Sequence, residues 1–232
     1  MITGVENKKA TVIGLGKSGL ASVRLLLAKG ASVSVSEAKE DPALIRLANA
    51  LEQEGALVEL GGHTRRWIEG RDLIVTSPGV PPQSLPLRWA GEAKIPILSE
   101  IELGFLYCPG RIVAVTGTNG KSTTTALLGE ILQKGGKRCF ICGNIGTPFC
   151  EIVPKMTEEH WAVVEVSSFQ LEHCHAFKPR IAMVLNIAPN HLDRHPSFEA
   201  YQSAKRRIAQ AQSEDDALIL NAEDPHARTL GE

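Results

Sequence analysis

Short apolar runs alternate along this chain with longer segments in which apolar residues recur every three or four positions. Such runs predict buried strands, and the longer period predicts helices that bury one face. In the first half, the predicted strands are residues 10–13, 31–36, 57–60 and 72–75, and helices are predicted at 20–28 and from Pro42 onward. In the second half, the predicted strands are 111–116, 138–142, 162–166, 181–185 and 217–220, with helices at 121–134 and 198–212. Alternating strands and helices indicate an α/β fold with mostly parallel sheets.

A break in this pattern lies at residues 107–110, Tyr-Cys-Pro-Gly, where an apolar helical segment stops. Proline and glycine together are typical of the end of a helix. The chain has 232 residues, which is enough for two domains of ordinary size. We therefore expect one α/β domain over residues 1–109 and a second over residues 110–232.

A glycine turn joins the first strand of the second half to its helix, in the sequence V-T-G-T-N-G-K-S-T-T of residues 115–124. Strand, glycine turn, Gly-Lys-Ser and helix form the architecture of a phosphate-binding loop (P-loop), in which backbone N–H groups and the helix N-terminus hold phosphate. Lys121 would neutralise the phosphate, and the Ser122 hydroxyl can bind Mg²⁺. Val115 stands where the usual pattern has its first glycine, so the loop is shorter than usual. The alternative is an ordinary strand-to-helix turn.

A second glycine pattern, Gly14-x-Gly16-x-x-Gly19, follows the first strand, and Glu37 closes the next strand. This arrangement fits a Rossmann-like dinucleotide fingerprint and by itself suggests NAD. A UDP pyrophosphate would satisfy the same N–H groups, and a purely structural turn is also possible. The turn-rich segment 77–82 follows the fourth strand, where ligands of parallel sheets bind.

Polar side chains follow two further strands of the second half. Glu165 ends the strand 162–166, which we expect beside the P-loop strand, so its carboxylate could hold Mg²⁺. Alternatively, Glu165 is a solvated charge at the end of the strand with no role in metal binding. His191 and Asp193 follow the strand 181–185 and should face the same sheet edge, although a histidine there can be purely structural. Lys205, inside a predicted helix, is by itself interpreted as a solvent-facing lysine.

Composition excludes several classes of protein. The formal net charge of −1 gives no reason to expect binding to nucleic acid or to a membrane surface, and no apolar run approaches the roughly 18 residues of a membrane span. The N-terminal residues are polar and do not resemble a signal peptide. Cys139 and Cys142 have the spacing of a metal-binding pair, but they lie in a predicted strand, where their side chains should not converge. The odd number of cysteines, five, suggests reduced thiols in the cytosol.

Four segments together resemble the ATP-dependent Mur ligases of peptidoglycan synthesis: residues 116–124, 143–146, 165–172 and 190–195. Ser-Ser-Phe-Gln-Leu-Glu at 167–172, with 77–79 and 99–103, is similar to the branch that joins D-glutamate to UDP-N-acetylmuramoyl-L-alanine. The resemblance implies a Rossmann-like UDP-sugar-binding domain followed by an incomplete P-loop-type ATPase domain. It also implies ATP, two Mg²⁺ ions and a cytoplasmic monomer.

The resemblance implies a role for each matching position. Catalytic roles fall on Lys121, Glu165, His191 and Lys205. ATP would be bound by Gly117, Thr118, Asn119, Gly120, Lys121, Ser122 and Thr123. Contacts with the UDP part fall on Leu15, Gly16, Lys17, Ser18, Glu37, Ser77, Pro78 and Gly79, and contacts with the muramoyl-alanine end on Asn144, Ser167 and His191. One Mg²⁺ would be held by Ser122 and Glu165, and a second by His191 and Lys205, the latter carbamylated by CO₂.

Members of this family carry a third, C-terminal domain that helps to bind ATP and contains most of the D-glutamate site. We therefore expect the chain to be an N-terminal fragment that binds the UDP-sugar but lacks full ligase turnover. Two rival functions stay open at this point. One is an NAD-dependent oxidoreductase, which has no use for the P-loop or for Glu165 and His191. The other is a non-catalytic nucleotide-binding module.

Overall fold

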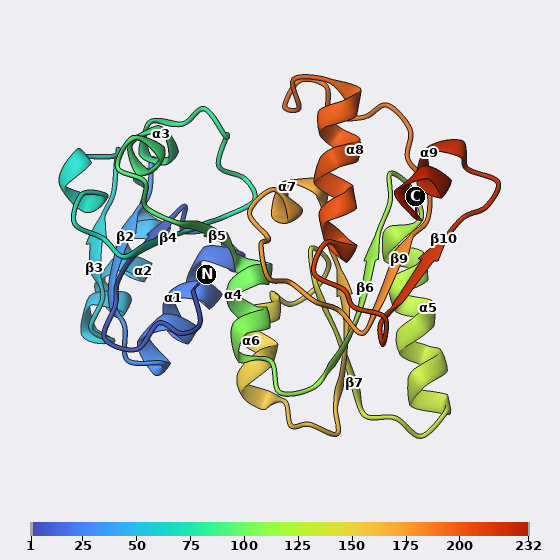
Figure 1. The fold of residues 1–232 in the computed structure, drawn as a ribbon. Helices are drawn as coiled ribbons and strands as arrows, with labels where there is room; N and C mark the ends of the chain where they lie inside the picture. Colours follow the sequence, from blue (N-terminus) through green and yellow to red (C-terminus); the bar gives the residue numbers. More distant parts are fainter. Residues whose placement is uncertain (1, 232) are drawn as a thin grey trace.

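The computed structural model describes residues 2–231, which fold around two five-stranded parallel sheets with helices on their faces (Figure 1). This arrangement confirms the predicted α/β fold. The first sheet has the order β3-β2-β1-β4-β5. Its strands are β1 (Lys9–Ile13), β2 (Ser32–Ser36), β3 (Leu57–Glu59), β4 (Leu73–Thr76) and β5 (Ile97–Ser99). The order reverses at β1 and β4, which opens a crevice at the carboxyl ends of these strands.

Four helices accompany the first sheet: α1 (Lys17–Ala28), α2 (Pro42–Gln53), α3 (Leu85–Glu92) and α4 (Glu100–Tyr107). The predicted helix start at Pro42 is confirmed, since the Asp41 side chain accepts hydrogen bonds from the N–H groups of Ala43 and Leu44. Such an N-cap satisfies donors that lack a partner within the helix. Two short elements, β5 with three residues and α3 with eight, were not predicted.

The second sheet has the order β10-β9-β6-β8-β7. Its strands are β6 (Arg111–Thr116), β7 (Cys139–Gly143), β8 (Trp161–Glu165), β9 (Ile181–Val184) and β10 (Ala217–Leu220). The helices are α5 (Lys121–Lys134), α6 (Phe149–Ile152), α7 (Ser168–Leu171), α8 (Phe198–Arg206) and α9 (Pro225–Arg228). All five predicted strands are present within about one residue, and α5 has the predicted bounds. The predicted helix 198–212 is wrong in length, because α8 gives way to a 3₁₀ turn at Arg207–Ala209.

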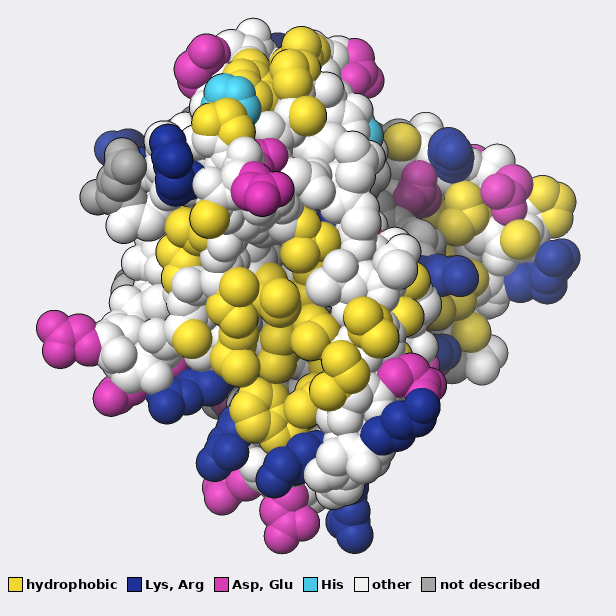
Figure 2. All heavy atoms as spheres, turned by 90° about the vertical axis from the view of Figure 1, so that its right-hand side faces the viewer, with side chains coloured by type: hydrophobic (Ala, Val, Ile, Leu, Met, Phe, Trp, Pro, Cys, Tyr) yellow, Lys and Arg dark blue, Asp and Glu magenta, His cyan; other side chains and the backbone are white. Residues whose placement is uncertain are grey.

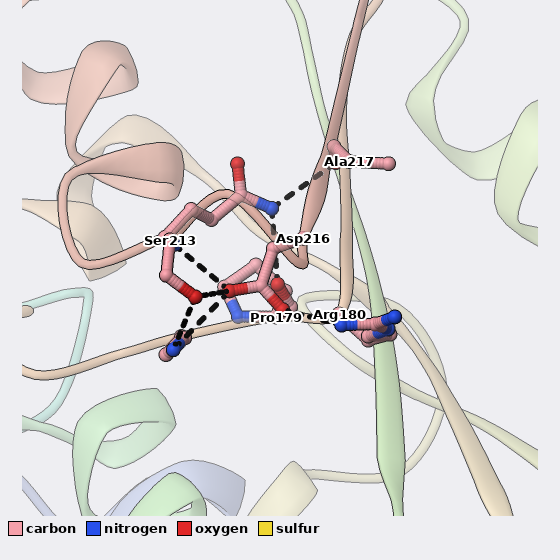
Figure 3. A network of polar contacts seen from close by, with 7 residues as sticks. Pro179, Arg180, Ser213, Asp216 and Ala217 are labelled. Carbon is pink, nitrogen blue, oxygen red and sulfur yellow. Dashed lines mark hydrogen bonds and ion pairs between the residues drawn. The ribbon is translucent and has the colours of Figure 1, made fainter.

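A polar network fixes the edge strand β10 to β9 (Figure 3). The Asp216 carboxylate accepts hydrogen bonds from the N–H and the hydroxyl of Ser213, and it forms ion pairs with Lys178 and Arg180. The Gln212 amide donates to the carbonyls of Pro179 and Ala217. The turn before β10 is thereby tied to the segment before β9, which sets the register of the two strands.

Helix α4 takes part in both halves of the molecule. Ile101 lies in the hydrophobic core of the second sheet, whereas Leu103 lies in that of the first. The buried carboxylate of Glu100 accepts a hydrogen bond from the N–H of Cys150, and that of Glu102 accepts from the N–H groups of Ala176 and Phe177. The two halves are therefore joined by shared packing and by buried hydrogen bonds, and a domain boundary at residues 109 and 110 stays a prediction.

An apolar surface patch lies over α5 and the edge strand β10. Figure 2 views the molecule from the side of α5 and β10 and shows hydrophobic side chains gathered there. Leu127 and Ile131 of α5 are 57% and 56% exposed, and Ile219 of β10 is 47% exposed. Within residues 2–231, no helix is both long enough and apolar enough to cross a lipid bilayer.

Candidate active site

The P-loop connects β6 to α5 and leaves backbone donors free at the start of the helix. Gly120 precedes the helix with φ of +82°, a left-handed conformation that favours glycine. The N–H groups of Thr118 and Asn119 donate to Asn186, at 2.9 and 2.8 Å. Among residues 2–231, no acceptor faces the N–H groups at positions 121–123, which open the helix. Free N–H groups at a helix N-terminus form a site for an anion.

Glu165 meets the P-loop serine at the end of β8. Its carboxylate is 2% exposed and accepts hydrogen bonds from the Ser122 hydroxyl at 2.7 Å and from the Asn144 side-chain amide at 2.8 Å. The alternative of a solvated strand-end charge is therefore excluded. A serine hydroxyl beside a carboxylate offers the hard oxygen donors that suit Mg²⁺. No cluster of three or more His, Cys, Asp and Glu side chains is placed to bind a metal in the described part of the chain.

A cavity of about 210 Å³ opens beside the P-loop. Seven residues singled out from the sequence lie on its wall: Gly117, Thr118, Lys121, Asn144, Ser167, His191 and Lys205. The rest of the wall consists of Ser168, Phe169 and Tyr201. Tyr201 has no predicted role, and its hydroxyl lies 2.9 Å from that of Thr118. The available signal was its position four residues before Lys205, on the same face of α8.

Lys205 is buried, so its interpretation as a solvent-facing lysine is wrong. Lys205 is 1% exposed. Its Nζ donates hydrogen bonds to the Gly117 carbonyl at 2.9 Å and to the Thr116 hydroxyl at 3.3 Å. Burial, together with the positive charge of Lys121, lowers the pKa of Lys205 to about 7. A large share of its side chains is therefore uncharged at neutral pH, and an uncharged lysine amine is a nucleophile.

His191 lines the cavity from a tight turn. Its φ is +54°, and its carbonyl accepts the N–H groups of Arg194 and His195. A left-handed conformation is uncommon outside glycine and is typical of residues held at functional sites. Asp193 lies on the same turn but is exposed and does not line the cavity.

The second glycine loop borders a larger cavity of about 630 Å³ at the carboxyl ends of β1, β2 and β4. Predicted residues on its wall are Leu15, Gly16, Glu37, Ser77 and Gly79. Lys17, Ser18 and Pro78 are not among the lining residues, so for these three the cavity does not support the predicted contact. Lys17 instead lines a separate groove of about 540 Å³ between α1 and α6.

The Glu37 carboxylate forms hydrogen bonds with the backbone at the glycine loop. It accepts the N–H of Leu15 at 2.6 Å and that of Lys39 at 2.9 Å. The Ser77 hydroxyl donates to the Gly14 carbonyl at 2.9 Å. A Cβ at Gly19 would lie 2.0 Å from that carbonyl oxygen, so only glycine permits α1 to begin this close to the loop. Glu37 thus shapes the loop through its backbone.

Fold and cavities together define an α/β protein with a P-loop in its second half. Comparison with known families refines this class. Residues 115–232 match the Mur ligase middle domain, and residues 8–99 match the Mur ligase MurD-like N-terminal domain. The chain therefore belongs to the Mur ligase family.

Curated relatives carry a more specific name. The chain is 48% identical over 220 residues to the UDP-N-acetylmuramoylalanine–D-glutamate ligase of Koribacter versatilis, covering 95% of this chain and 49% of that protein. It is 47% identical over 223 residues to the enzyme of the same name from Acidobacterium capsulatum, covering 96% and 48%. The chain thus spans about half the length of the curated relatives that it matches.

Two solved structures with a similar fold are more distant in sequence than these relatives. The UDP-N-acetylmuramate:L-alanyl-gamma-D-glutamyl-meso-diaminopimelate ligase of Neisseria meningitides superposes with a TM-score of 0.60 at 18% identity, covering 96% of this chain and 74% of that one. A murein peptide ligase of Psychrobacter arcticus gives 0.57 at 18% identity, covering 96% and 51%. At this identity the likeness establishes the fold alone.

Proposed function

We propose that this chain provides the UDP-sugar-binding and phosphate-binding parts of an ATP-dependent ligase. The ligase joins D-glutamate to UDP-N-acetylmuramoyl-L-alanine in the synthesis of peptidoglycan precursors. The observation that carries the proposal is the cavity beside the P-loop, whose wall brings Lys121, His191 and Lys205 together. The names of the curated relatives support the choice of substrates. We place the reaction in the cytoplasm and expect a monomer.

The proposed chemistry follows from the low reactivity of a carboxylate toward an amine. The L-alanine carboxylate attacks the γ-phosphorus of ATP, ADP leaves, and an acyl phosphate forms. The D-glutamate amine then attacks the acyl carbon, and its nitrogen loses a proton. The bond between that carbon and the phosphate oxygen breaks, so phosphate leaves from the tetrahedral intermediate and the amide forms. Lys121 and the free N–H groups of the P-loop would hold the β- and γ-phosphates, while Asn144 and Ser167 would position the muramoyl-alanine end. The contribution of the protein is mainly positioning and electrostatic stabilisation.

Metal binding would use two residues on the wall of this cavity, His191 and Lys205, and the Ser122–Glu165 pair at the start of α5. Ser122 and Glu165 would hold one Mg²⁺, and His191 with Lys205 would hold a second. When bound, Mg²⁺ neutralises the charge that builds on phosphoryl oxygens. Lys205 fits this role only after its amine has added to CO₂, which releases a proton and creates a carbamate. Its lowered pKa supports this step, because the uncharged amine is the reactive form.

In the first half, the cavity beside Glu37 would take the uridine diphosphate. Its volume of about 630 Å³ is within the range of small-molecule sites.

Calorimetry tests this function directly. The chain should bind UDP-N-acetylmuramoyl-L-alanine, and it should bind Mg-ATP separately. NAD serves as the competing ligand. Binding of NAD without binding of the UDP-sugar would contradict the proposal and favour an oxidoreductase.

A further inference from the structure

One side chain connects the walls of the two cavities. Arg194 lies on the turn that carries His191, and its Nη2 donates to the carbonyl oxygen of Val80 at 2.6 Å. Val80 lines the large first cavity and lies in the segment between β4 and α3, which runs toward α7 in Figure 1. These two residues are 114 positions apart in the sequence. The hydrogen bond therefore joins the loop of one sheet to the loop of the other.

The contacts continue on both sides of this bond. Toward the first glycine loop, the Val80 side chain lies 3.0 Å from the position that a Cβ on Gly14 would occupy. Toward the P-loop cavity, the Arg194 guanidinium carbon lies 4.0 Å from the centre of the Phe169 ring. That ring in turn contacts the His191 ring edge-on, with 5.0 Å between their centres. Gly14, Val80, Arg194, Phe169 and His191 thus form one continuous path of contacts.

The turn that bears Arg194 is itself firmly held. His195 is 2% exposed, with Nε2 3.0 Å from the Ser168 hydroxyl and Nδ1 3.2 Å from the Glu172 carboxylate. Its ring also stacks on Phe169, with 5.3 Å between the centres. A displacement of the guanidinium would be passed to the Phe169 and His191 rings, because His195 restrains the other side of the turn.

We propose that Arg194 is a positioning residue that couples the two cavities. When a nucleotide diphosphate fills the first cavity, the segment that carries Val80 adjusts around it, and Arg194 transmits this adjustment to the ring of His191. The inference rests on the proposed function for the identity of the first ligand. It adds a link between the two sites, which neither cavity shows by itself. Such a link is established when ligand binding at one site produces a measured change at the other.

The experiment uses nuclear magnetic resonance of the 232-residue chain, with UDP as the ligand. UDP lacks the muramoyl-alanine part that would approach His191 directly, so an effect on His191 must be transmitted. The amide signal of Leu15 reports binding at the glycine loop, and the ring signals of His191 report the distant response. The variants are Arg194→Ala and Arg194→Lys. Arg206→Ala, which removes an exposed guanidinium from α8, is the control.

In the wild-type chain and in Arg206→Ala, UDP should shift both Leu15 and His191. In Arg194→Ala the Leu15 shift should persist, with an affinity for UDP within about threefold of wild type, whereas the His191 shift should be lost. Arg194→Lys should restore part of the shift, because an ammonium can still donate to Val80 but lacks the planar face that stacks on Phe169.

Three results would overturn the inference alone. The first is a full His191 shift in Arg194→Ala, and the second is a wild-type chain in which UDP shifts Leu15 but not His191. The third, which a purely structural role predicts, is that Leu15 loses its response together with His191 in both Arg194 variants. If UDP leaves Leu15 unmoved in the wild-type chain, both the proposed function and the inference are wrong.

Discussion

The Ser122 hydroxyl donates a hydrogen bond to the Glu165 carboxylate at 2.7 Å, across 43 positions of sequence. The register of β6 and β8, which pairs Val115 with Glu165, brings them together. Ser122 opens the helix after one strand, and Glu165 ends the neighbouring strand. Parallel pairing places both at the same edge of the sheet, where a phosphate and its metal ion would bind.

Replacing Lys121 by alanine should weaken binding of ATP and leave binding of the UDP-sugar unchanged. A charge-assisted contact of this kind contributes about 2 kcal/mol, which corresponds to roughly 30-fold in affinity. Calorimetry with each ligand in turn measures both effects. A large loss of UDP-sugar affinity would show that the two cavities have been assigned the wrong ligands.

The reciprocal change is Glu37→Ala. Without its carboxylate, the N–H groups of Leu15 and Lys39 lose their acceptor, and the glycine loop loses its shape. UDP-sugar affinity should fall about tenfold, because one to two hydrogen bonds that order the loop are lost. ATP affinity should stay within about twofold. Glu40→Ala, at an exposed neighbouring position, is the matched control.

Glu165→Gln separates metal binding from nucleotide binding. The amide keeps the size of the side chain and can still accept the Ser122 hydroxyl, but it removes the negative charge. Affinity for ATP measured with Mg²⁺ should fall at least about tenfold, whereas affinity measured with a chelator should change little. Glu130→Gln on the exposed side of α5 should show neither effect. Equal affinities of Glu165→Gln and wild type for Mg-ATP would remove Glu165 from the proposed metal site.

Carbamylation of Lys205 should depend on pH. Because burial lowers the pKa of Lys205 to about 7, the uncharged amine becomes the main form as the pH rises through that value. With ¹³C-labelled CO₂ held at a fixed dissolved concentration, a carbamate carbon signal should grow over this interval. Lys205→Arg should abolish the signal and Lys178→Arg, at an exposed position, should keep it. A signal that survives in Lys205→Arg would assign the carbamate to another amine.

Glu100 should make the stability of the protein depend on pH. Burial raises the pKa of Glu100 from its ordinary value of 4.5 to about 7, and its Oε2 has no hydrogen-bond partner among the described residues. A raised folded-state pKa means that the folded protein binds the proton more tightly than the unfolded chain. The resulting stabilisation is complete below pH 4.5 and is lost as the pH rises through about 7.

Chemical denaturation across this interval measures the effect. Wild type should lose about 3 kcal/mol of unfolding free energy relative to Glu100→Gln, which cannot ionise. Glu158→Gln, at an exposed position, should follow the wild-type curve. Parallel curves for wild type and Glu100→Gln would show that the pKa of Glu100 is the same in the folded protein and in the unfolded chain.

Much of the fold could be predicted from local pattern. Nine of ten strands follow from short apolar runs, since a strand buried on both faces is apolar throughout. Helix α7 has only four residues, too few for the helical period to appear, and the three-residue strand β5 was also not predicted. The length of α8 was overestimated, because its amphipathic pattern continues through the 3₁₀ turn that ends the helix.

The candidate site divides in the same way. The two glycine loops and Glu165 could be predicted from the sequence. Each lies at the end of a strand, and the role of each follows from residues close to it in the sequence. Tyr201 and Arg194 were given no role, since each acts through a residue far away in the sequence, Thr118 and Val80. Lys205 was misread from its residues alone, because a lysine in an amphipathic helix is usually exposed and only packing reveals burial.

The sequence by itself determined the local chemistry of this protein: where strands turn into helices, which turns require glycine, and which ends carry charge. These features depend on residues within a few positions of one another, so local sterics and hydrogen bonding decide them. Only the tertiary structure decided that Lys205 is buried, that α4 serves two cores and that Arg194 reaches Val80. Burial and long-range contact arise when distant segments pack together, and no local pattern encodes that distance.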